Sequence, residues 1–233
     1  MTLWNWPAFL GYLGSPFLLA GAWTTIWLTA VSAFLGLVLG ALVAAARMSR
    51  FASLRNAAGF YVWVMRGTPL LVQLVIIFTG LPQFGIRLSV IMSAIVGLAL
   101  NEAAYLSEII RGAVQSIPRG QRNAGLALGL TPAQTMRDVV LPQAVRIMLP
   151  MLGNSVNGLL KATSITSAIS MEELLRRTNL LIQEQFLTLE LFAVASIYYL
   201  AMTSVWSLAQ GWLERRFSRG HDFGGRYDNA EQR

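Results

Sequence analysis

A chain of 233 residues that is 55% hydrophobic and 12% charged, with a mean hydropathy of +0.55, is too apolar for a soluble domain, in which about a quarter of residues are charged. The lipid bilayer is therefore its expected solvent. The absence of cysteine excludes disulfides, thiolate metal sites and cysteine nucleophiles. The net charge of +7 comes from arginines beside apolar segments, so it does not indicate nucleic-acid binding.

Five apolar stretches are long enough for transmembrane helices, which need about 20 residues each. They predict an all-α membrane protein with five spans. The Gly67-Thr68-Pro69 sequence interrupts the second stretch, and Pro150 and Gly153 interrupt the fourth. Residues 1–16 are expected to form an interfacial or periplasmic N-terminus of the mature protein, and residues 218–233 a polar tail. The five stretches are 17–46, 60–80, 89–110, 147–169 and 189–213.

Small residues follow one face of the first span, at Gly36, Gly40 and Ala44. This spacing lets a second helix approach closely. Packing within the chain is the favoured interpretation, and a subunit interface is the alternative.

The arginines predict the orientation of the spans. They are concentrated after the first span, in the long loop between the third and fourth spans, and after the fifth span. Because positive residues remain in the cytoplasm, the N-terminus is predicted outside, and the 112–146 loop and C-terminus inside. The chain is expected to cross its membrane several times.

The sequence lacks the residues of most enzymes. It contains no Gly-x-x-x-x-Gly-Lys-Ser/Thr phosphate loop, and its one histidine, His221, lies in the tail. Glu102 and Glu108 are six residues apart and face different directions on a helix, so they do not form a carboxylate dyad. We expect no enzyme activity and no bound metal. If the protein moves a solute uphill, the energy must come from an ion gradient or from a separate ATPase.

Two charged residues within the spans are candidates for a substrate pathway, because charge is costly there. Lys161 suits a substrate carboxylate or, alternatively, an ion pair with Glu102 or Glu108. Arg66 precedes the break at Gly67-Thr68-Pro69, where Pro69 frees a backbone carbonyl, although Arg66 also suits an extended side chain that reaches the inner surface. Thr163 and Ser164 offer hydroxyls beside Lys161. Glu108 and Arg111 predict a local ion pair.

The 118–144 segment predicts two short helices in the long loop. Residues 121–128 favour a helix that ends at Gly129, and Thr131-Pro132-Ala133-Gln134 has the pattern of a helix start with a capping box. The second helix is expected to end near Leu141-Pro142. Leu126 and Leu128 give the first helix apolar side chains, which suit either the bilayer surface or a partner protein.

Several motifs together resemble the permease subunits of ABC importers, in the branch that takes up polar amino acids. In the loop the family pattern matches Ala124, Gly129 and Leu141-Pro142. Outside the loop the resemblance rests on four segments, Arg66-Gly-Thr-Pro-Leu-Leu-Val-Gln73, Ala104-Tyr-Leu-Ser-Glu-Ile-Ile-Arg-Gly112, Leu141-Pro-Gln-Ala144 and Lys161-Ala-Thr-Ser164.

This resemblance implies five transmembrane helices in the inner membrane of a bacterium and a second identical or sister permease subunit. It also implies two cytoplasmic ATPases that carry ATP and Mg²⁺, and an extracytoplasmic amino-acid-binding protein. The 121–130 helix would then couple to the ATPase. The residues implied in coupling are Gln121, Asn123, Ala124, Gly125, Leu126, Leu128 and Gly129.

Three positions depart from the family pattern. Asn123 replaces an expected glutamate and so removes one negative charge, and Gly125 replaces an alanine. Ala162 stands where an aspartate is common, which argues against a cationic substrate. An ion-coupled secondary carrier and a non-transporting membrane scaffold are the alternative functions. A secondary carrier would be expected to show an inverted repeat, and none is evident in the sequence.

Overall fold

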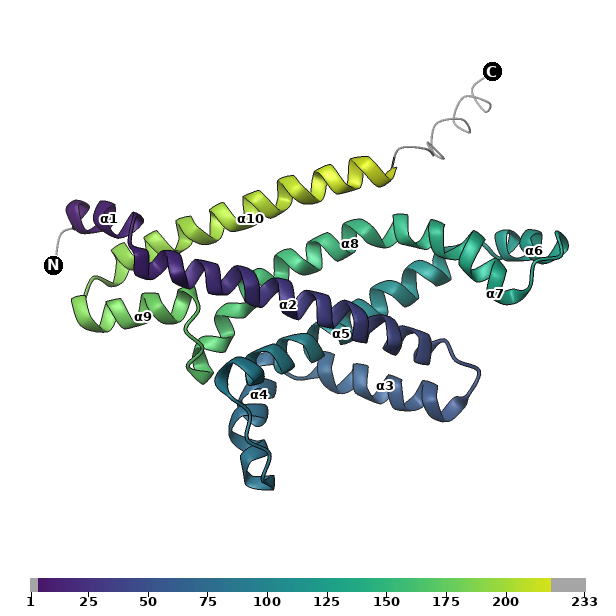
Figure 1. Ribbon diagram of the computed structural model, residues 1–233, viewed down its shortest axis with the longest axis horizontal. Helices are drawn as coiled ribbons and strands as arrows, with labels where there is room; N and C mark the ends of the chain where they lie inside the picture. The colour runs from purple at the N-terminus through teal and green to yellow at the C-terminus, as the bar shows by residue number, and fades with distance from the viewer. Residues whose placement is uncertain (1–3, 219–233) are drawn as a thin grey trace, which may run out of the picture.

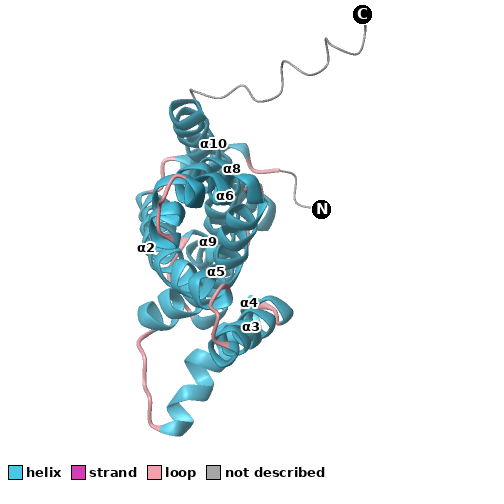
Figure 2. Ribbon diagram, turned by 90° about the vertical axis from the view of Figure 1, so that its right-hand side faces the viewer, coloured by secondary structure: helices cyan, strands magenta, loops and turns pink. Residues whose placement is uncertain are grey.

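The computed structural model describes residues 4–218, and every regular element in that range is a helix (Figures 1 and 2). The predicted tail lies outside the described residues except for Ser218. The elements are α1 (Trp6–Leu13), α2 (Pro16–Arg47), α3 (Ala52–Gly67), α4 (Leu70–Val75), η1 (Ile76–Gly80), η2 (Leu81–Phe84), α5 (Val90–Ser116), α6 (Arg119–Ala127), α7 (Pro132–Gln134), η3 (Thr135–Val140), α8 (Leu141–Ala162), η4 (Thr163–Ile169), α9 (Leu174–Gln185) and α10 (Thr188–Ser218).

Four helical stretches of the described chain are long and apolar enough to cross a membrane. They are Pro16–Arg47, Val90–Ser116, Pro132–Ile169 and Thr188–Arg216. The pair Ala52–Gly67 and Leu70–Phe84 is bent by 107°, and it brings the number to five if it forms one span. The bend lies at the predicted break, and Figure 1 shows α4 turning away from the bundle. The all-α architecture predicted from the sequence is confirmed.

The centre of the bundle is the interface between α2 and α5, which is the most extensive contact between two helices. A Cβ atom on Gly36 would lie 2.9 Å from Glu102 Cγ, and one on Gly40 would lie 3.0 Å from the Ala103 carbonyl oxygen. Ala44, one turn further on, is fully buried. The small residues of the first span therefore pack within the chain, as the favoured interpretation predicted.

One predicted helix end is wrong. The second loop helix was expected to stop near Leu141-Pro142, but η3 is a π-helix that continues directly into α8. In η3 the Leu141 N–H donates to the Met136 carbonyl, five residues back. The wider π turn accommodates Pro142, which has no N–H to donate, so the proline does not end the helix. Pro150 also lies within α8 without ending it.

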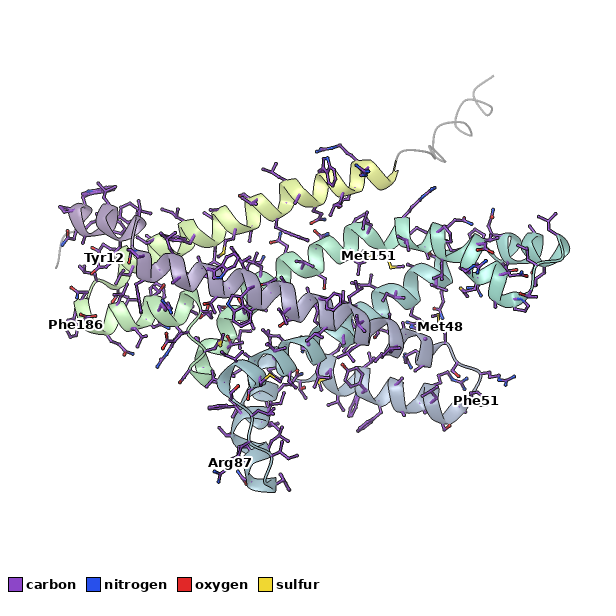
Figure 3. All side chains as sticks on the ribbon, viewed as in Figure 1. Tyr12, Met48, Phe51, Arg87, Met151 and Phe186 are labelled. Atoms are coloured by element: carbon purple, nitrogen blue, oxygen red, sulfur yellow. The ribbon has the colours of Figure 1, made fainter. Side chains whose placement is uncertain are left out.

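The two ends of the bundle carry different short elements. Figure 1 shows α6 and α7 at one end and α1 and α9 at the other. In Figure 3, Met48 and Phe51 mark the α2–α3 turn toward the α6 end, and Tyr12 and Phe186 lie at the opposite end.

The helix α9 is not among the elements that the sequence predicts. Its N-terminal capping residue is Glu173, which is fully buried and whose carboxylate accepts hydrogen bonds from the Leu175 and Arg176 N–H groups at 2.9 and 2.7 Å. The Tyr199 hydroxyl of α10 donates to the same carboxylate at 3.0 Å. The Leu174 N–H donates to the Thr25 hydroxyl of α2 at 3.3 Å, so this helix start joins three helices.

Candidate functional site

The break between α3 and α4 is held by two side-chain amides. Pro69 cannot donate to the carbonyl of Met65, four residues earlier. That carbonyl instead accepts from Gln73 Nε2 at 2.9 Å and from Asn101 Nδ2 at 3.2 Å. Gln73 also donates to the Thr68 carbonyl and hydroxyl at 3.1 and 2.8 Å, and accepts from Asn101 at 3.0 Å. The freed carbonyl is therefore satisfied within the protein, and Asn101 forms the interhelical bond that a polar residue in a span favours.

Arg66 lies beside a cavity of about 600 Å³ between α3, α5 and α8. Its guanidinium lies 5.2 Å from the centroid of the Tyr105 ring, a cation–π distance. Asn154 and Ser155 of α8 also line this cavity.

Glu108 also lines this cavity and forms an ion pair with Arg111 at 2.6 Å. Arg47 of α2 approaches the same carboxylate at 3.4 Å, so the cluster joins α2 to α5. Glu102 is buried and accepts a hydrogen bond from Ser155 at 2.5 Å. The two glutamates thus have separate partners, as expected from their spacing.

Lys161 lines a different, larger groove of about 840 Å³ between α8 and α10. Among residues 4–218 it forms no ion pair, so the alternative pairing with Glu102 or Glu108 does not occur. Ser164 lines the same groove. Thr163 is fully buried and donates to the Leu160 carbonyl, so its hydroxyl faces the protein interior.

The short helix α6 and the turn that follows it form the segment predicted for coupling. It is anchored by the Arg122 guanidinium, which donates to the Val114 carbonyl at 3.1 Å, and by Gly125, which is buried against Thr135. Gly129 has φ +81°, a left-handed conformation that glycine adopts without strain, and Thr131 and Gln134 form the predicted capping box.

The remaining residues of α6, together with Leu128 just after it, present an exposed surface. Asn123, Ala124 and Gln121 are exposed, and Leu126 and Leu128 are 47% and 83% exposed.

Several site residues gave little sequence signal. Tyr105, Asn157 and Tyr199 line the two cavities, and Gln73 closes the helix break. A glutamine four residues after a proline in an apolar span is a usable signal, because it can reach the carbonyl that the proline frees. The groove residues of α10 could be found only after α8 and α10 had been placed together.

No cluster of three or more potential metal ligands occurs in the described part of the chain.

The profile of the family "Binding-protein-dependent transport system inner membrane component" matches residues 36–219. The chain is 38% identical over 203 residues to the probable amino-acid ABC transporter permease protein YckA of Bacillus subtilis, covering 87% of this chain and 90% of that protein. It is 39% identical over 213 residues to the glutamine transport system permease protein GlnP of Escherichia coli, covering 91% and 94%.

Solved structures agree with this similarity. A crystal structure of an amino acid ABC transporter with histidines matches with a TM-score of 0.86 and 34% identity, covering 93% of this chain and all of that one. An inward-facing MetNI methionine ABC transporter has the same fold, with a TM-score of 0.73 and 23% identity over 87% and 97% of the two chains. The chain belongs to the family of binding-protein-dependent transport system inner membrane components, and it is a membrane permease subunit of an ABC transporter.

Proposed function

We propose that this chain forms the translocation pathway of an ATP-driven importer of polar amino acids, together with a second permease subunit. An extracytoplasmic binding protein would deliver the substrate, and separate ATPase subunits would bind ATP and Mg²⁺. The relatives whose names mention amino-acid or glutamine transport support this substrate class. The cavities beside Arg66 and Lys161 support a pathway along α8, which lines both of them.

The observation that best supports the coupling role is the position of α6. It stands at one end of the bundle, exposes Leu126 and Leu128, and is anchored at Arg122 and Gly125. A rigid helix with exposed apolar side chains suits a groove on a partner protein, because burying those side chains is favourable. We propose Gln121, Asn123, Ala124, Gly125, Leu126, Leu128 and Gly129 as the coupling segment.

The proposed orientation places the α6 end in the cytoplasm and α1 and α9 outside, in accordance with the arginine distribution. The permease domain is then 17–217, with the coupling loop at 112–146, the N-terminus at 1–16 outside and the tail at 218–233 inside. Modification by a membrane-impermeant thiol reagent of cysteines introduced singly at Gln183 and Gln121 tests this orientation. Labelling of Q121C but not of Q183C in intact cells would contradict it.

For the substrate pathway we propose Arg66, Lys161 and Ser164 as lining residues. Gly67, Thr68 and Pro69 form the bend that places Arg66 beside its cavity, and Thr163 lies next to Ser164 with its hydroxyl bonded to the Leu160 carbonyl. Replacement of Lys161 by methionine should reduce uptake by the reconstituted complex. Normal binding and transport by Lys161→Met would remove Lys161 from the pathway.

The coupling role is tested by replacing residues 121–130 with a Gly/Ser linker of equal length. In the reconstituted complex, we expect ATP-dependent uptake to disappear while the permease still folds and inserts. Full ATP-coupled uptake by this variant would exclude the coupling role. Gradient-dependent uptake without any ATPase would instead favour the secondary carrier.

A further inference from the structure

The turn between α2 and α3, together with the start of α3, carries an excess of positive charge. Arg47, Arg50 and Arg55 lie there, and residues 47–66 contain no Asp or Glu. Within the described part of the chain only Arg47 of these three has an acidic partner, the Glu108 carboxylate at 3.4 Å. A further arginine of α5 shares that carboxylate at 2.6 Å. The other two arginines of the turn are exposed, and their charge is not neutralised by the described chain.

The guanidinium groups of Arg50 and Arg55 are held in place by contacts that leave most of their N–H groups available. That of Arg50 lies 4.8 Å from the centroid of the Phe51 ring. That of Arg55 donates from Nη1 to the Ser49 carbonyl at 3.4 Å. A guanidinium that stacks on a ring keeps the N–H groups of its edge, and this edge can bind two oxygens of one phosphate. The turn therefore offers two positioned donors to an oxyanion.

An apolar surface begins beside these arginines and continues along α3. Phe51 and Leu54 are exposed at its start, and Phe60 and Trp63 are 65% and 70% exposed further on. The last two rings lie against each other, with centroids 5.8 Å apart. Helix α3 packs on α2 and α5, and Figure 1 shows it at the edge of the bundle. Trp63 lies about 12 Å beyond Arg55 along the helix, less than the half-thickness of about 15 Å of the hydrocarbon core.

We propose that the α2–α3 turn and the exposed face of α3 bind an anionic phospholipid. The phosphodiester oxygens accept from the guanidinium groups of Arg50 and Arg55, and an acyl chain lies along Phe60 and Trp63. Helix α3 belongs to the bent pair that forms the fifth span, so its exposed face is continuous with the lipid-facing surface of the spans. This continuity favours a lipid over a free phosphate ion. The inference does not depend on which solute is transported.

The charge of the turn selects the lipid headgroup. Phosphatidylcholine carries an ammonium group beside its phosphate, and this cation would meet two arginines whose charge is not neutralised. No carboxylate of the described chain forms an ion pair with Arg50 or Arg55, so none is placed beside them to receive the ammonium. Phosphatidylglycerol brings the phosphate without a cation. Basic residues next to a span attract anionic lipids for this electrostatic reason.

The test uses the permease assembled with its partner subunits in lipid nanodiscs. The chain has no cysteine, so Ala57→Cys at an exposed position of α3 gives one site for a bimane fluorophore, once the cysteines of the partner subunits are replaced by serine. The nanodiscs contain equal amounts of phosphatidylglycerol and phosphatidylcholine, with bromine on the acyl chains of one lipid only. Bromine quenches bimane at close range, so exchanging the brominated lipid gives the relative occupancy of the surface. We expect phosphatidylglycerol to be preferred at least about fivefold.

A double variant tests the arginines. Arg50→Gln/Arg55→Gln should reduce the preference to less than about twofold. Arg215→Gln/Arg216→Gln removes the same charge from the last turn of α10 and is the matched control, which should leave the preference unchanged. An equal loss in both double variants would show a general effect of surface charge and would overturn the proposal. An unchanged preference in Arg50→Gln/Arg55→Gln would overturn it as well.

Two results with the native arginines would also contradict the proposal. If neither brominated lipid quenches the bimane, a protein such as the second permease subunit covers this face. If both lipids quench it equally, the face contacts lipid without selecting a headgroup. The lipid preference is measured without transport, so a complex that imports no amino acid would contradict the proposed function and leave this inference standing.

Discussion

Gly125 of α6 packs so closely against Thr135 of η3 that a Cβ atom at position 125 would lie 2.9 Å from Thr135 Cγ2. Thr135 is buried, and its hydroxyl has no hydrogen-bond partner in the described structure. The glycine that replaces the family's alanine therefore matches a threonine on the facing segment. This pair determines how close α6 lies to the start of α8.

Gly125→Ala should displace α6 and reduce coupling. We expect ATP-driven uptake by the reconstituted complex to fall several-fold, with a loss of stability of about 1–3 kcal/mol from the overpacked contact. The double variant Gly125→Ala/Thr135→Ala removes both close atoms and should recover most of the uptake. Thr135→Ala alone is the control. If the double variant is as impaired as the single one, the contact does not explain the effect.

Asn123 is exposed on α6, at the position where the family pattern has glutamate. If the ATPase offers an arginine there, Asn123→Glu should create a charge-assisted pair and strengthen assembly. We expect a several-fold lower dissociation constant for the ATPase at low salt, and a smaller gain at high salt because ions screen the pair. Asn56→Glu on α3 serves as the control. Unchanged or weaker assembly would show that α6 binds the ATPase through the shape of its surface and not through a charged pair at position 123.

Gln73 and Asn101 should be important for the stability of the bent pair α3–α4. Gln73→Leu leaves the Met65 carbonyl with one partner and removes both bonds to Thr68. The expected cost is about 1–3 kcal/mol, because buried polar groups lose their partners. The melting temperature of the purified complex measures it. Gln83→Leu, at an exposed residue of η2, should change it little; equal losses for both variants would contradict this assignment.

The pH dependence of stability should show the effect of the buried Glu173 carboxyl. Burial raises the pKa of this carboxyl above its usual range, against the lowering effect of its hydrogen bonds to Leu175 and Arg176. The folded protein therefore holds the proton more tightly than the unfolded chain. The resulting stabilisation is complete below the usual carboxyl pKa and is lost as the pH rises through the raised value.

We expect Glu173→Gln to flatten the fall in melting temperature between acidic and neutral pH. Glu172→Gln, at the exposed neighbour, should leave the wild-type slope. Glu173→Ala should flatten the slope in the same way and should also lose the helix cap, which costs about 1 kcal/mol relative to Glu173→Gln. Identical slopes for the wild type and Glu173→Gln would refute the assignment.

The sequence predicted those features that depend on local composition and spacing. Long apolar stretches located the spans, the Gly67-Thr68-Pro69 sequence located the bend, and the Thr131 capping box located a helix start. The 36–40 glycine pair indicated close helix packing, which the α2–α5 interface confirms.

Features that depend on tertiary structure could not be predicted from the sequence. The helix α9 is short and polar, and its first turn depends on Glu173, Tyr199 and Thr25 from three separate regions. The continuation through Pro142 depends on a π turn, which has no simple sequence pattern. The groove near Lys161 requires α8 and α10 to lie side by side, so Asn157 gave no signal of its own.

Because no break separates η3 from α8, the stretch from Thr135 to Lys161 is one continuous helix. Its 26 residue steps span about 40 Å at the rise of an α-helix, so a tilt of about 5° at the α6 end moves Lys161 by about 3 Å. Such a displacement is as large as a hydrogen-bond length. A small rotation where α6 meets its partner, carried along this continuous helix, is therefore enough to make or break a contact in the distant groove.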